Sequence, residues 1–94
     1  MIPVEDIRFH LRIDATDEDD YLLALRDAAL EYIEKMTGQI ASAPDYPLTL
    51  RHAALLLIGA WYANREAVAD GAKVQVPLAF EMLINLNRPA EGLI

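Results

Sequence analysis

The stretch that decides the fold is Ala53–Ala63, AALLLIGAWYA, which carries no charge. It lies inside a pattern that predicts one helix from about Leu48 to Val68. A helix on a protein surface shows one apolar stripe, so a helix that is apolar on all sides must be covered on all sides. At about 1.5 Å per residue it would be roughly 31 Å long, close to the roughly 32 Å diameter of a compact domain of this size. We therefore expect it to run through the molecule, with a neighbouring subunit covering what three shorter helices leave exposed.

Two helices are predicted before the central one. Pro3 suits a first helical turn, and the apolar positions after it predict a helix that ends near Arg12. Thr16 followed by Asp19 resembles a capping box, so the second helix should begin in this acidic region. Gly38 is placed to be its left-handed C-cap. The apolar stripe of the second helix is expected to contain Leu22, Leu25, Ala29, either Tyr32 or Ile33, and Met36.

One helix is predicted after the central one. Pro77 opens it, and it stops before Pro89 because the residue ahead of a proline avoids helical geometry. Its apolar positions are expected to be Leu78, either Phe80 or Met82, Leu83 and Leu86. The segment Gly71–Val76 has an alternating pattern that suits a short hairpin or an arm. The predicted fold class is all-α: a small bundle of about four helices around a long apolar central helix, in a single domain over residues 1–94.

Composition excludes several classes of protein. The chain has no cysteine, which removes disulfides and thiolate metal sites. The apolar run is shorter than the roughly 20 residues that a membrane-spanning helix needs, and no signal peptide is expected. A net charge of −7, with eight scattered basic residues, argues against tight phosphate binding.

Acidic side chains gather before the second helix, at Asp14 and at Asp17, Glu18, Asp19 and Asp20. Their alternation suggests a calcium loop. However, the sixth position would be Asp19 instead of glycine and the twelfth would be Leu25 instead of glutamate. We therefore expect these carboxylates to be solvated and to stabilise the start of the helix.

Catalytic chemistry has little support in the sequence. His10 and His52 are the only histidines, Ser42 is the only serine, and no nucleophile elbow or metal-binding helix motif is present. We expect no enzyme activity, and we predict no catalytic, metal or cofactor site.

The junction between the apolar run and the polar end of the central helix carries large aromatic residues beside an arginine. Such residues are favoured at subunit interfaces. The alternative is that Trp61 is a core residue and that Arg65 offsets the helix dipole. Both interpretations remain open for this junction, which comprises Trp61, Tyr62, Asn64, Arg65 and Glu66.

Taken in order, these segments resemble the gp6-like head-tail connector (adaptor) proteins of tailed bacteriophages. The resemblance covers nearly the whole chain: EDIRFHLRID at Glu5–Asp14, DEDDYLLALRDAALEYIEKMTG at Asp17–Gly38, YANRE at Tyr62–Glu66 and VPLAFEMLINLNR at Val76–Arg88. It implies an all-helical structural subunit of the virion, from a free phage or a prophage. Such a subunit forms a homo-oligomeric ring at the head-tail junction after assembly in the host cytoplasm.

The resemblance also implies partners and surfaces. The portal protein would lie on one side of the ring and a tail-side connector or stopper protein on the other, with DNA passing through the channel without specific binding. An acidic turn at Asp17, Glu18, Asp19 and Asp20, if it faces that channel, would repel the phosphate backbone. The subunit interface is expected at Trp61, Tyr62, Asn64, Arg65 and Glu66, with an arm that carries Val74 and Val76. The alternative function is a small intracellular adaptor that binds a partner helix through its apolar helix.

Overall fold

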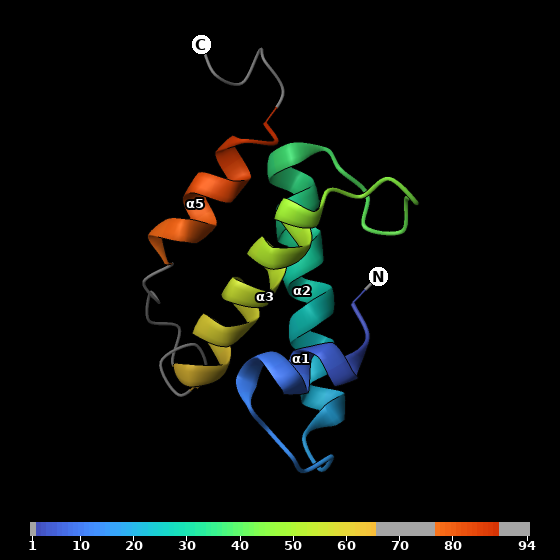
Figure 1. Ribbon diagram of the computed structural model, residues 1–94, viewed down its shortest axis with the longest axis vertical. Helices are drawn as coiled ribbons and strands as arrows, with labels where there is room; N and C mark the ends of the chain where they lie inside the picture. The colour runs from blue at the N-terminus through green and yellow to red at the C-terminus, as the bar shows by residue number, and fades with distance from the viewer. Residues whose placement is uncertain (1, 66–76, 89–94) are drawn as a thin grey trace.

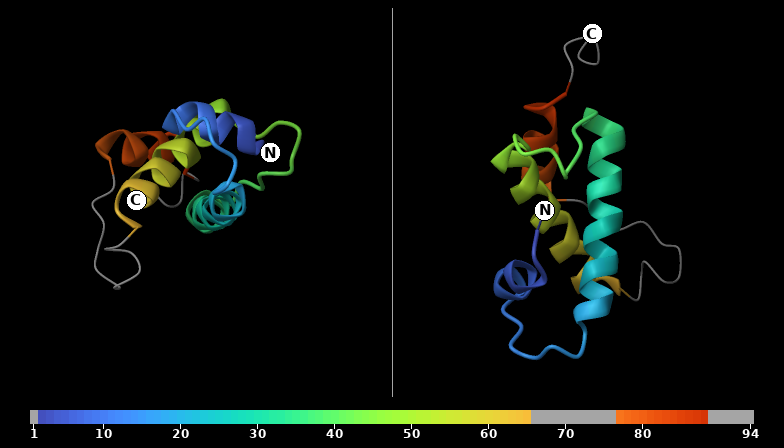
Figure 2. Two further views of the ribbon diagram at one scale, coloured as in Figure 1. Left: turned by 90° about the horizontal axis from the view of Figure 1, so that it is seen from below. Right: turned by 90° about the vertical axis from the view of Figure 1, so that its right-hand side faces the viewer.

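A computed structural model describes residues 2–65 and 77–88 of the chain. The described residues form four helices and no strand, namely α1 (Val4–Leu11), α2 (Asp19–Thr37), α3 (Leu48–Ala63) and α5 (Leu78–Asn85). Helix α3 lies in the middle, with α2 along one side, α5 along another and α1 packed against both α2 and α3 (Figure 1; Figure 2). The predicted all-α bundle around a central apolar helix is confirmed. The predicted hairpin or arm at Gly71–Val76 lies outside the described residues.

Helix α3 forms the centre of the core, but two expectations about it are corrected. It ends at Ala63 and not at Val68, because Asn64 caps it and donates its side-chain amide to the carbonyl oxygen of Ala60 at 2.9 Å. Its apolar run is also covered within the chain, since only Ala63 of residues 53–63 is exposed. The residues that α3 buries are Leu50, Ala53, Ala54, Leu55, Leu57 and Ile58.

Helix α1 packs against α2 and α3, and its bounds agree with the predicted helix that ends near Arg12. The chain turns at Arg12, which has a left-handed φ of 59°. The end of α1 lies against α3 at Gly59, where an added Cβ would stand 3.6 Å from Leu11 Cδ2. Close by, the rings of His10 and His52 meet edge to face with centroids 6.4 Å apart.

Helix α2 ends where the sequence predicts, at Gly38, with φ 76° and its N–H bonded to the Glu34 carbonyl. On the inner face, Ile33 is buried and Tyr32 is exposed, which settles that alternative. The predicted capping box is wrong. The N-cap residue is Glu18 rather than Thr16, and no side chain caps the helix.

Helix α5 is apolar on two opposite faces. Phe80 and Ile84 are buried against the bundle. Of the predicted inward positions, Phe80 is the correct one of the two alternatives, and Leu83 is partly buried against the core. Leu78 and Leu86 were placed wrongly, since they are 71% and 74% exposed, and the other alternative, Met82, is 61% exposed. Residues two apart on a helix lie about 200° apart, so the Phe80 face and the Met82 face cannot both be buried. Here the larger Phe80 ring takes the inner position.

A side-chain hydrogen bond also holds this orientation of α5. Asn87 donates its amide to the hydroxyl oxygen of Thr49 at 2.8 Å and to the carbonyl oxygen of Leu83 at 2.9 Å. Because Thr49 lies in the first turn of α3, the bond joins the end of α5 to the start of the central helix.

Candidate assembly interface

The acidic turn before α2 is partly neutralised within the chain. Asp19 Oδ1 lies 2.9 Å from Nε of Arg8 in α1. Glu18 pairs with Arg65 beyond the end of α3. In the described part of the chain, Asp17 and Asp20 form no ion pair. Of the four predicted channel-facing acids, these two therefore keep an uncompensated charge.

Glu18 is the centre of a cluster that joins α2 to the end of α3. The Tyr62 hydroxyl donates a hydrogen bond to its carboxylate at 2.6 Å, and Arg65 donates a second. The Arg65 guanidinium carbon stands 5.2 Å from the ring centroid of Tyr62 and 5.9 Å from that of Tyr21. Both distances lie within the range of a cation–π contact. We call Glu18, Tyr21, Tyr62 and Arg65 the Glu18 cluster.

The contacts of the Glu18 cluster shift its ionisation. The hydrogen bond from Tyr62, and then that from Arg65, lowers the pKa of the Glu18 carboxyl because both stabilise the carboxylate. The same hydrogen bond raises the pKa of Tyr62, since losing the proton would remove the donor. The cluster is therefore a charged hydrogen-bonded contact at neutral pH.

The structure brings some of the predicted interface residues together and not others. Tyr62 and Arg65 meet Glu18, so two predicted sites that lie far apart in the sequence share one cluster. Trp61 is partly buried and packs against the core. Asn64 caps α3. The remaining three residues, Glu66, Val74 and Val76, lie outside the described residues.

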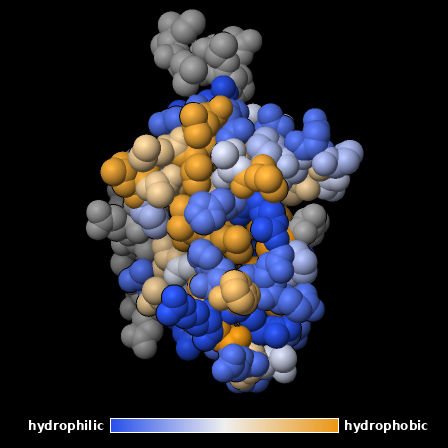
Figure 3. Space-filling view, in the orientation of Figure 1, coloured by the Kyte–Doolittle hydropathy of each residue, from blue (hydrophilic) through white to orange (hydrophobic). Residues whose placement is uncertain are grey.

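Sequence reasoning missed the exposed apolar face of α5. We call Leu78, Met82 and Leu86 the α5 stripe. Figure 3 shows apolar surface gathered on the side of the molecule that α5 forms. The signal was present in the sequence, because two apolar series with a spacing of four residues are offset by two positions: 78, 82, 86 and 80, 84. Such a pattern indicates a helix with two apolar faces.

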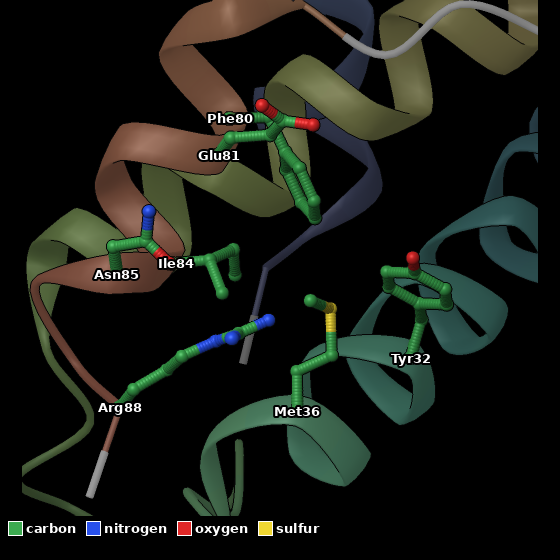
Figure 4. A pocket seen from close by; sticks show the side chains of 7 residues that line it. All are labelled: Tyr32, Met36, Phe80, Glu81, Ile84, Asn85 and Arg88. Atoms are coloured by element: carbon green, nitrogen blue, oxygen red, sulfur yellow. The ribbon is translucent and has the colours of Figure 1, made fainter. Parts of the chain in front are cut away.

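Two hollows accompany these surfaces. One of about 160 Å³ lies between α2 and α5, and the Arg88 side chain points into it toward Met36 (Figure 4). A second, of about 260 Å³, lies under the loop that joins α2 to α3 and is lined by Tyr46, Pro44 and Ile2 among others. The Tyr46 hydroxyl is buried there without a hydrogen-bond partner among the described residues.

Within residues 2–65 and 77–88, no three His, Asp or Glu side chains come together in a way that could hold a metal ion. None of the described helices combines the length and the hydropathy needed to span a membrane.

Known proteins match this chain by sequence family and by fold. The family model described as phage gp6-like head-tail connector protein matches residues 1–90. The crystal structure of bacteriophage HK97 gp6 superposes with a TM-score of 0.78 at 19% identity, covering 94% of this chain and 93% of that one. No curated protein sequence matches the chain significantly. The structural match shows a common fold, and the family match spans nearly the whole sequence. The chain therefore belongs to the gp6-like head-tail connector family and is a structural connector protein of the phage virion.

Proposed function

We propose that the chain is the repeated subunit of a ring at the head-tail junction. The ring joins the capsid portal to a tail-side connector or stopper protein and leaves a channel through which DNA passes. The observation that carries this proposal is the α5 stripe, an exposed apolar surface on a member of a connector family. Exposed apolar patches of several hundred Å² mark protein interaction sites.

A ring needs one contact that repeats between two different surfaces of the subunit. The Glu18 cluster lies within one subunit. It supports assembly only indirectly, because it holds the start of α2 against the end of α3. The connector role requires no catalytic step, and the family is structural. The adaptor alternative is less well supported, because α3 is covered within the chain and offers little free apolar surface to a partner helix.

The acidic turn is proposed to face the channel through Asp17 and Asp20. Their charges have no ion-pair partner among the described residues, and the chain has a net charge of −7. Negative charge on a channel wall repels the phosphate backbone, so that DNA passes without being held. Replacing both residues by asparagine should leave the ring intact and increase DNA retention. A ring with unchanged DNA retention would contradict a channel-facing position for this turn.

The ring itself is tested by measuring mass. The purified chain is studied by light scattering and native mass spectrometry over a wide concentration range, alone and with the portal protein of the same phage. A discrete large oligomer, or a stoichiometric ring on the portal, is expected. A chain that stays monomeric and does not bind the portal under either condition would refute the proposed function.

A further inference from the structure

We draw no further inference here: the strongest candidate, the exposed apolar face of α5 formed by Leu78, Met82 and Leu86, carries nothing beyond the proposed ring, because nothing in the structure shows what covers it.

Discussion

Replacing Phe80 by alanine tests which face of α5 packs against the bundle. The ring is 2% exposed and lies 6.1 Å from that of Tyr32, centroid to centroid. Truncation of a buried phenylalanine costs about 3–5 kcal/mol. Phe80 also borders the hollow of about 160 Å³ between α2 and α5, so water and the flexible Met36 side chain can partly fill the new space. We therefore expect a loss of about 3 kcal/mol, at the low end of that range.

Such a loss is large for this chain. A domain of 94 residues has a stability of about 5–14 kcal/mol, and each kcal/mol lowers Tm by roughly 4–8 °C. Phe80→Ala should therefore lower Tm by roughly 12–24 °C in thermal unfolding followed by circular dichroism. The matched variant Met82→Ala, on the exposed face of the same helix, should change the free energy of unfolding by less than about 0.5 kcal/mol.

Oligomer formation also stabilises a fold, so both variants are measured at two protein concentrations. The loss in Phe80→Ala should be the same at both concentrations. Any loss in Met82→Ala should appear only where the wild type is assembled. Equal destabilisation by the two variants at low concentration would refute the packing of α5 described above, and the α5 stripe with it.

Four further predictions concern single residues. Gly38→Ala should cost about 1 kcal/mol in urea unfolding, because φ is 76° there, whereas Gly59→Ala should stabilise α3 by up to about 1 kcal/mol, because its Cβ finds ordinary contacts at 3.6 Å. Burial, and then the charge of His52, lowers the pKa of His10 below 6.5, so the unfolded chain binds the proton more readily. Stability should fall as the pH drops below about 6.5, and His10→Gln should flatten that part of the pH profile. Tyr62→Phe should raise the pKa of Glu18 in a carboxyl NMR titration and weaken the stability that this carboxylate contributes above its unfolded pKa, whereas an unchanged titration would exclude the hydrogen bond.

The helix ends were predictable where one residue decides them. Gly38 ends α2 because glycine adopts the left-handed conformation without strain. Pro47 and Pro77 precede α3 and α5, since proline suits the start of a helix and not its interior. The end of α3 was placed too late, because the apolar pattern continues beyond Ala63 whereas the Asn64 side chain competes for a helical carbonyl.

The contacts between elements could not be read from the sequence. Glu18 and Tyr62 lie 44 positions apart, and neither has a local pattern that indicates the other. The inner face of α5 was ambiguous for a different reason. Both of its faces are apolar, so hydrophobic periodicity alone cannot choose between Phe80 and Met82. That choice depends on the space left between α2 and α3, which only the folded bundle defines.

The hydrogen bond from Asn87 to Thr49 has a consequence for folding specificity. Both faces of α5 are apolar. Turning the helix about its axis would therefore bury the α5 stripe in place of the Phe80 face at little cost in hydrophobic free energy. The hydrogen bond from Asn87 to Thr49 disfavours that alternative orientation of the helix, since Asn87 would lose its partner. One amide thus separates two nearly degenerate packings of α5 and determines which of its apolar sides is exposed on the surface of the molecule.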